Sequence, residues 1–195
     1  MPPHVSYVAV MTAHPGRQQI GADRGRLMLR TRREGMASVA GHDLAIEVTR
    51  WSGELAVGDD LAPSGLQVRI DMGSLAVREG TGGAKPLNDK DRRDIVSTAR
   101  KTLGVDSHPE AAFTASTFER ADGGWLVSGT FALHGQQRPL QMRVTDAGED
   151  RYRFTASVVQ SEYGIKPYTG FFGALKVRDE VQVEGEVDLS EKSGT

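Results

Sequence analysis

Apolar and polar residues alternate along most of this chain, and this alternation restricts its fold more than any other feature. The pattern is clearest in residues 66–72, 152–158 and 181–189. Because side chains on a strand point to opposite faces with period two, each segment predicts a strand with one buried and one wet face. A closed antiparallel barrel buries all the apolar faces against one interior and leaves no free sheet edge. We therefore expect an all-β fold whose function lies in its interior.

Further alternating segments cover residues 26–33, 44–57 and 112–146, and short glycine-containing turns join the later ones. Neighbouring strands joined by such turns form an antiparallel meander. The count is about eight strands, and a barrel of that size is either filled by side chains or holds one small ligand. In residues 44–57 the alternation changes phase near Arg50, which predicts a β-bulge. The expected fold is an extended eight-stranded antiparallel lipocalin-like β-barrel with one amphipathic helix.

The helix is predicted over residues 88–103. Asn88 is a favourable N-cap, and Asp91 lies three residues later, where a carboxylate stabilises the helix N-terminus. Gly104 suits the position after the last turn. Since the apolar stripe covers only one face, we expect the helix to cover one end of the barrel or to flank its wall. Residues 78–85, which precede the helix, are predicted to form a glycine-rich loop without a phosphate-binding motif.

The length of 195 residues is typical of one all-β domain. We expect a flexible leader over residues 1–24, the barrel over residues 25–190 and a tail over residues 191–195. The N-terminus lacks the basic region and the long apolar run of a secretory signal, and no segment is suited to a transmembrane helix. These features favour a cytoplasmic location. Met11 is a candidate physiological start.

Several function classes receive no support from the composition. Without cysteine, the chain has no disulfide and no thiolate ligand or nucleophile. A net charge of −2 argues against a general nucleic-acid binder. None of the five histidines is spaced for a metal site, and no nucleophile elbow or catalytic triad is evident. We expect no catalytic residue, no metal and no cofactor.

Inward-facing apolar positions come from strands far apart in the sequence. A solid core and an apolar cavity give the same hydrophobic pattern, so periodicity leaves both open. The inward positions from residue 127 onward are Val127, Phe131, Leu133, Met142, Val144, Phe154, Val158, Val183 and Val187.

Four segments resemble the YceI-like polyisoprenoid-binding proteins. Residues 108–116 are similar to the family's Tyr-Pro-x-x-x-Phe-x-Ser stretch, and residues 129–140 to its Gly-x-Leu-Thr-Ile-His-Gly…Lys-Pro-Val hairpin. Residues 161–165 resemble Ser-Asp-Phe-Gly-Ile, and residues 179–181 resemble a late Asp-Glu-Val. Gln160 stands where the family has arginine. The resemblance implies an eight-stranded lipocalin-like barrel with a long apolar tunnel for a polyprenyl or other long-chain amphiphile.

The favoured function is therefore sequestration or transport of a polyisoprenoid, quinone or similar lipid by a protein that is not an enzyme. Lys166, Tyr168 and Lys176 are candidate partners of a polar head group. The aromatic, glycine-rich residues 165–175 suggest an entrance and a transient membrane contact, with the end that carries His42 and His134 as the alternative entrance. The expected ligand-binding residues are Val127, Phe131, Leu133, Met142, Val144, Phe154, Val158, Tyr163, Tyr168, Phe171, Phe172 and Val183.

The rival interpretation is a filled barrel that serves as a structural or protein-interaction module without a ligand. Trp51, Tyr163, Phe171 and Phe172 would then be core residues or interface anchors. The sequence leaves the oligomeric state open, with a homodimer among the alternatives.

Overall fold

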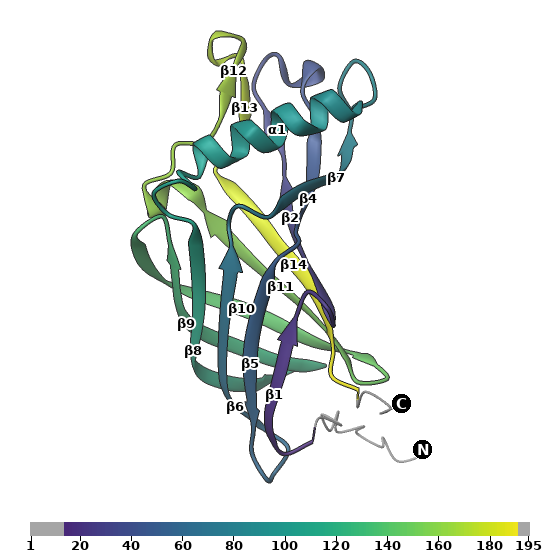
Figure 1. Cartoon of the computed structure of the whole chain (residues 1–195), viewed down its shortest axis with the longest axis vertical. Coiled ribbons are helices and arrows are strands. Elements are labelled where there is room, and N and C mark those ends of the chain that lie inside the picture. Colours follow the sequence, from purple (N-terminus) through teal and green to yellow (C-terminus); the bar gives the residue numbers. More distant parts are fainter. Residues whose placement is uncertain (1–13, 191–195) are drawn as a thin grey trace, which may run out of the picture.

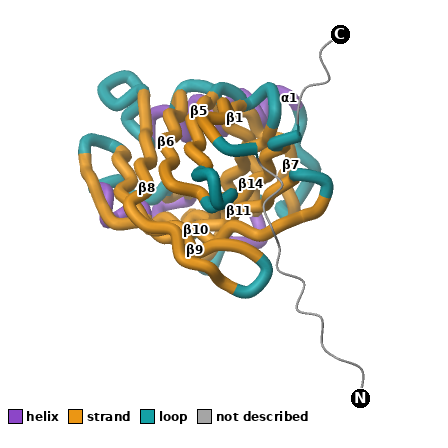
Figure 2. The backbone as a smooth tube through the Cα atoms, turned by 90° about the horizontal axis from the view of Figure 1, so that it is seen from below, coloured by secondary structure: helices purple, strands orange, loops and turns teal. Residues whose placement is uncertain are grey.

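The structure of the chain is a computed structural model, and it describes residues 14–190. An antiparallel sheet of eleven strands curls around one interior, as Figures 1 and 2 show. Its strand order is β1-β5-β6-β8-β9-β10-β11-β14-β2-β4-β7. The strands are β1 (Gly16–Gly21), β2 (Gly25–Thr31), β4 (Asp43–Val48), β5 (Trp51–Val57), β6 (Pro63–Asp71), β7 (Leu75–Thr81), β8 (Glu110–Ala121), β9 (Gly124–Leu133), β10 (Gln136–Gly148), β11 (Arg151–Val159) and β14 (Glu180–Asp188).

The count of eleven corrects the expectation of eight strands. Three long stretches of chain are each interrupted once, at residues 22–24, 49–50 and 72–74. The two halves of each stretch then pair in different parts of the sheet, because β5 joins β1 to β6 whereas β4 joins β2 to β7. The same three stretches consequently form both ends of the strand order. The all-β, antiparallel character agrees with the prediction, as does the one α-helix within residues 14–190. The expected closure is wrong, because β1 and β7 end the strand order without pairing with each other, and the sheet curls into a half-barrel.

Two of the interruptions are held together by Ser74, which is buried between them. Its hydroxyl donates to the carbonyl of Asp71 at 2.8 Å, and the backbone N–H of Arg50 donates to this hydroxyl at 3.0 Å. The backbone N–H of Thr49 donates to the Ser74 carbonyl at 2.9 Å. The phase change near Arg50 is therefore a two-residue break with its own hydrogen bonds, instead of the predicted bulge within one strand.

Two further segments differ from expectation. Residues 16–21 were expected in the flexible leader, but they form β1 and pair with β5. Their polar composition hides the strand, since Arg17, Gln18 and Gln19 interrupt the alternation. Residues 78–81 were expected in a loop, but they complete β7 opposite β4. Residues 1–13 of the expected leader, the candidate start Met11 among them, and the expected tail at residues 191–195 lie outside the described residues.

The predicted helix is α1 (Asp89–Thr102). Asn88 and Asp91 form a capping box, in which the Asp91 N–H donates to Asn88 Oδ1 at 2.9 Å and the Asn88 N–H donates to Asp91 Oδ2 at 3.1 Å. Gly104 has a φ of 59°, the left-handed conformation expected after the last turn. The helix lies across one end of the curled sheet (Figure 1). Within residues 14–190, no helix combines the length and apolar character needed to cross a membrane.

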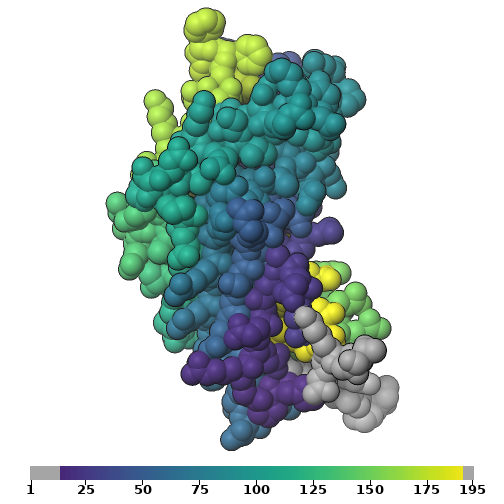
Figure 3. Space-filling model, in the orientation of Figure 1, coloured from purple at the N-terminus to yellow at the C-terminus, as the bar shows by residue number. Residues whose placement is uncertain are grey.

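A small second sheet stands at the same end as α1. It contains β3 (Arg33–Glu34), β12 (Thr169–Gly170) and β13 (Leu175–Val177), in the order β12-β13-β3. Short 3₁₀ helices at Ser38–Ala40 and Phe171–Gly173 extend it. We call residues 32–42 and 166–178 together the rim. Its C-terminal part projects beyond the helix at the top of Figures 1 and 3.

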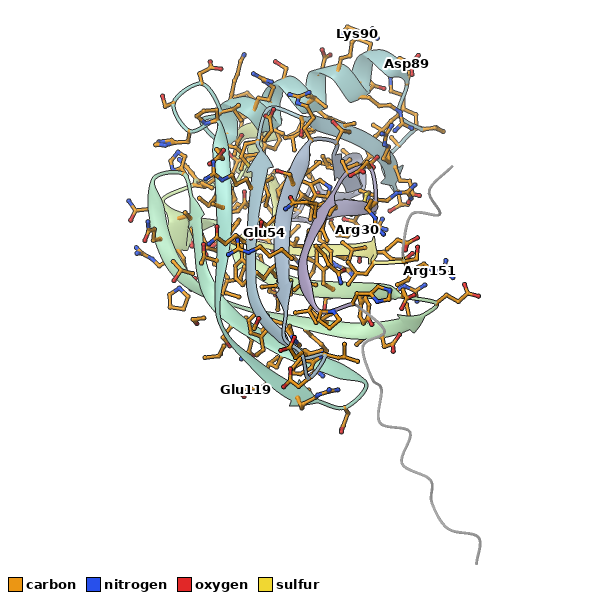
Figure 4. The ribbon with its side chains drawn as sticks, turned by 60° about the horizontal axis from the view of Figure 1, so that its bottom comes forward. Arg30, Glu54, Asp89, Lys90, Glu119 and Arg151 are labelled. Atoms are coloured by element: carbon orange, nitrogen blue, oxygen red, sulfur yellow. The ribbon has the colours of Figure 1, made fainter. Side chains whose placement is uncertain are left out.

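The outer surface of the main sheet is polar, as the alternation predicts. Charged side chains such as Glu119 and Arg151 project from it (Figure 4). Arg153 pairs across strands with Glu186 at 2.8 Å, in an exposed position. Exposed pairs of this kind contribute roughly 0–1 kcal/mol each to stability. The sheet is therefore stabilised mainly by the backbone hydrogen bonds between its strands and by its apolar inner face.

Candidate functional site: an apolar cavity inside the sheet

A cavity of about 620 Å³ occupies the interior of the main sheet. All eleven strands of that sheet contribute lining residues, and almost all of these are apolar. Binding sites for small molecules usually measure about 300–1,000 Å³ and have mostly apolar walls with a few polar groups. The interior is therefore hollow. Of the two alternatives that the hydrophobic pattern left open, a solid core and an apolar cavity, the structure has the cavity.

Most of the expected ligand-binding residues line this cavity. They sit on the inner face of neighbouring strands, where cross-strand pairs such as Val127 with Met142 and Ala156 with Val183 place their side chains together. The expected residues that line the cavity are Val127, Phe131, Leu133, Met142, Val144, Phe154, Val158, Tyr168 and Val183.

Three expected residues lie elsewhere. Tyr163 is buried beside the cavity and packs edge-on against Phe131, with ring centroids 5.7 Å apart. Burial raises the pKa of the Tyr163 hydroxyl above its ordinary value. Phe171 and Phe172 point into solvent at the tip of the rim. These three residues therefore do not line the cavity, because a turn at the end of β11 and the backbone of the rim direct their side chains elsewhere.

The helix closes much of one end of the cavity. Ile95, Ala99 and Leu103 turn their apolar stripe towards the interior and line it. They pack against the buried core without being fully buried themselves. The predicted cover over one end of the barrel is therefore α1, and it forms part of the cavity wall.

Charged lining residues also gather at this end. Arg33, Lys85 and Lys176 line the cavity there, together with Asp91 and Asp94 of the helix. Lys85, Asp94 and Lys176 are exposed, so the cavity reaches solvent between the helix and the rim. We call this opening the mouth. A ligand whose tail enters the interior would keep a polar head group among these charges.

The two alternative entrances proposed from the sequence lie at this same end. His42 lines the cavity and its Nε2 lies 2.9 Å from the Lys85 carbonyl. His134 Nδ1 lies 3.0 Å from the carbonyl of Tyr163, next to the start of the rim. Of the head-group candidates, Tyr168 and Lys176 line the cavity, whereas Lys166 is exposed and does not.

The opposite end of the cavity is closed by large side chains. Trp125, Tyr152 and Leu189 are all buried there and line its floor. Arg120 pairs with Trp125 across β8 and β9, and its guanidinium carbon lies 4.1 Å from the ring centroid. The cavity therefore has one polar mouth and one apolar closed end, the arrangement that an amphiphile with a single head group requires.

A buried amide anchors the rim to the main sheet. Gln160 lines the cavity, and its Nε2 donates to the carbonyls of Arg178 at 3.0 Å and Asp179 at 3.3 Å. Asp179 in turn accepts a bond from the Ser161 N–H at 2.8 Å and another from the Ser161 hydroxyl. The two ends of the rim's C-terminal part are thus tied together at the mouth.

Two polar atoms in the cavity wall are buried without a hydrogen-bond partner: Thr31 Oγ1 and Trp51 Nε1. A buried polar group without a partner typically costs about 1–3 kcal/mol. Thr31 is the last residue of β2 and lies near the mouth. Trp51 is the first residue of β5 and follows the break between β4 and β5, so it lies deeper in the cavity. A ligand with a polar atom at either depth could supply the missing hydrogen bond.

The described residues offer no group of three potential metal ligands. The structure does bring two histidines together that sequence spacing left isolated, because the rings of His108 and His134 have centroids 4.6 Å apart. His108 lies in the segment between α1 and β8, and His134 directly follows β9. Neither residue lines the cavity.

Lining residues that were missed come from both halves of the chain, for example Trp125 and Tyr152 in the second half. Leu29, Ile46 and Ile70 line the cavity, as does Trp51. Their strands show the same period-two alternation as the later ones, so that signal could have identified them. The helix residues Thr98 and Thr102 also line the cavity, and only the docking of α1 over the mouth reveals them.

Comparison with known proteins agrees with this geometry. The model of the YceI-like domain matches residues 20–189. A search of curated proteins gives no match. Among solved structures, Burkholderia cenocepacia BcnA is similar over 86% of this chain and 98% of its own, with 18% identity and a TM-score of 0.57. The Campylobacter jejuni YceI protein is similar over 76% of this chain and 85% of its own, with 15% identity and a TM-score of 0.53.

Proposed function

This chain belongs to the YceI-like family, and from that premise we propose that it binds a long-chain apolar amphiphile, such as a polyisoprenoid or a quinone, in the cavity of its sheet. The single observation that carries the proposal is the apolar cavity of about 620 Å³ with one polar mouth. The function is binding, for sequestration or transport, without catalysis. A cytoplasmic location stays part of the prediction.

The energetics favour a ligand with a long tail. Each CH₂ group moved from water into an apolar site contributes roughly 0.8 kcal/mol. The inner walls, for example Val127, Met142 and Val183, offer the tail contact without directional bonds. Affinity should therefore rise with tail length until the cavity is full.

The mouth favours a polar head group. Lys176 and Arg33 offer positive charge there, and Asp91 and Asp94 offer carboxylates. Tyr168 adds a hydroxyl beside them. We propose that the head group remains among these residues while the tail extends towards Trp125 and Tyr152.

Extraction of the purified protein with organic solvent, followed by mass spectrometry, tests the proposal directly. We expect a lipid with a long apolar tail in about stoichiometric amount. Titration of ligand-free protein with fluorescent prenyl alcohols of increasing chain length provides the second test. An empty extract together with no saturable binding at any chain length would reject the proposal and favour the filled-module interpretation.

A further inference from the structure

The large apolar side chains that the described chain exposes all lie in the rim. They are Met36, Val39, Tyr168, Phe171 and Phe172. Single exposed apolar residues are common on protein surfaces, but a contiguous group marks an interaction site. Elsewhere in residues 14–190 no large apolar side chain is exposed. This group of exposed apolar side chains therefore indicates an interaction site at the rim.

The tip of the rim holds two aromatic side chains in an unfavourable backbone conformation. Phe171 and Phe172 have φ values of 48° and 55°, in the left-handed region that glycine adopts far more easily. Each such residue costs of the order of 1–3 kcal/mol. The hydrogen bond from the Ala174 N–H to the Phe171 carbonyl at 3.1 Å and the pairing of Gly170 with Leu175 maintain this turn. The backbone thus presents both rings to solvent, where glycine would make the same turn without this strain.

The rim is also basic. It carries five cationic side chains, Arg32, Arg33, Lys166, Lys176 and Arg178, and one carboxylate, Glu34. Glu34 lies 3.7 Å from Arg178. The whole chain has a net charge of −2, so positive charge is concentrated on this one feature. A basic surface with exposed aromatic rings is complementary to anionic lipid head groups over an acyl layer.

The rim is continuous with the mouth of the cavity. Arg33, His42, Tyr168 and Lys176 belong to the rim and line the cavity. In Figure 1 the tip at β12 stands beyond α1, so the rim extends further outward than the helix that covers the cavity. Whatever contacts the tip therefore also faces the mouth.

We propose that the rim docks on an anionic lipid bilayer, with Phe171, Phe172 and Met36 at the boundary between head groups and acyl chains. The cavity mouth then faces the bilayer, and a lipid passes between them without crossing water. A second copy of the chain fits the rim less well, because a two-fold contact would place the same five cations opposite each other. The docking surface stands on its own residues, whereas the exchange of lipid rests on the proposed function.

Vesicle co-sedimentation tests the docking. Wild-type protein is mixed with vesicles of phosphatidylcholine and phosphatidylserine at 70:30, or of phosphatidylcholine alone, at 0.1 M salt. We expect binding to the anionic vesicles, with at least tenfold weaker binding to the neutral ones. Raising the salt to 0.5 M should weaken the binding, because the Debye length shortens. A wild-type protein that binds neither kind of vesicle overturns the proposal.

Paired variants separate the apolar from the electrostatic contribution. Phe171→Ala with Phe172→Ala should weaken binding to anionic vesicles at least tenfold, as should Lys176→Glu with Arg178→Glu. The matched control, Arg143→Glu with Arg151→Glu, reverses two exposed arginines of the main sheet and should leave binding unchanged. Unchanged binding in either rim variant contradicts the proposal, provided that circular dichroism shows it to be folded.

Two further measurements distinguish the alternatives. A rim-dependent dimer in analytical ultracentrifugation, lost in the Phe171→Ala and Phe172→Ala variant, would assign the surface to a second copy and overturn the bilayer. A variant with a narrowed cavity, Ala156→Leu, should bind the prenyl ligand at least tenfold more weakly but still sediment with vesicles. If wild-type protein docks but binds no prenyl ligand, the proposed function fails while the docking surface stands.

Discussion

A single substitution inside the cavity can show whether the interior is hollow in solution. Ala156 lies on the inner face of β11, is buried, and pairs with Met142 on one side and Val183 on the other. All three residues line the cavity. Replacing Ala156 with leucine adds three carbon atoms that must enter the space between these walls.

The sign of the stability change depends on whether that space is empty. In a hollow interior, three buried carbons contribute about 2.4 kcal/mol at roughly 0.8 kcal/mol each. Restricting the leucine rotamers costs about 0.5–1 kcal/mol. The net gain is then about 1.5 kcal/mol, which corresponds to a rise in Tm of roughly 3–6 °C for a chain of this size. In a filled core, overpacking instead destabilises by about 1–3 kcal/mol.

The assay is urea unfolding of ligand-free protein, followed by titration with a fluorescent prenyl alcohol. We expect Ala156→Leu to be more stable than wild type and to bind the ligand at least tenfold more weakly. Thr155→Leu is the matched control, because Thr155 directly precedes Ala156 in β11 and is exposed on the outer face. A destabilised Ala156→Leu variant would refute the hollow interior, and an unchanged affinity would refute the placement of the tail beside β11.

Other changes test the helix, the mouth and the strand breaks. Asn88→Ala removes one half of the capping box and should cost about 1 kcal/mol, while hydrogen exchange as slow in α1 as in the central strands would exclude a mobile lid. Phe131→Trp should block prenyl binding with a Tm within a few degrees of wild type, and full lipid uptake by this variant would contradict its place in the tunnel. Ser74→Ala removes the hydroxyl that joins two interruptions of the sheet and should lower the free energy of unfolding by about 1–3 kcal/mol; no loss in urea unfolding would assign these breaks to the backbone alone. The pKa of the Tyr163 hydroxyl is raised in the folded state, so the unfolded chain loses the hydroxyl proton at a lower pH than the folded chain does. The free energy of unfolding should therefore fall as the pH rises above the ordinary pKa of tyrosine. The Tyr163→Phe variant should lack this part of the pH dependence.

Residues that interact with near neighbours were predictable. The capping box of Asn88 and Asp91 uses a fixed spacing of three residues, and the helix begins and ends where those signals place it. The meander from β8 to β11 follows from alternation and short turns, and its antiparallel pairing agrees. Most of the expected inward residues line the cavity for the same reason, since a period of two assigns a face without knowledge of the partner strand.

Residues whose role depends on distant partners were not predictable. Ser74 stabilises a break between two strands that the sequence presented as continuous, and β1 is a strand because β5 supplies its hydrogen bonds. Phe171 and Phe172 look like lining residues by composition, but the backbone of the rim turns them outward.

The sequence by itself determined that the strands are amphipathic, that one capped helix interrupts them and that their apolar faces share one interior. Only the tertiary structure decided that this interior is hollow, that α1 and the rim surround its mouth, and that the exposed aromatic residues stand beside that mouth. The physical reason is that local periodicity fixes which way each side chain points. The space left between opposite walls depends instead on how far the whole sheet curls, which no single segment encodes.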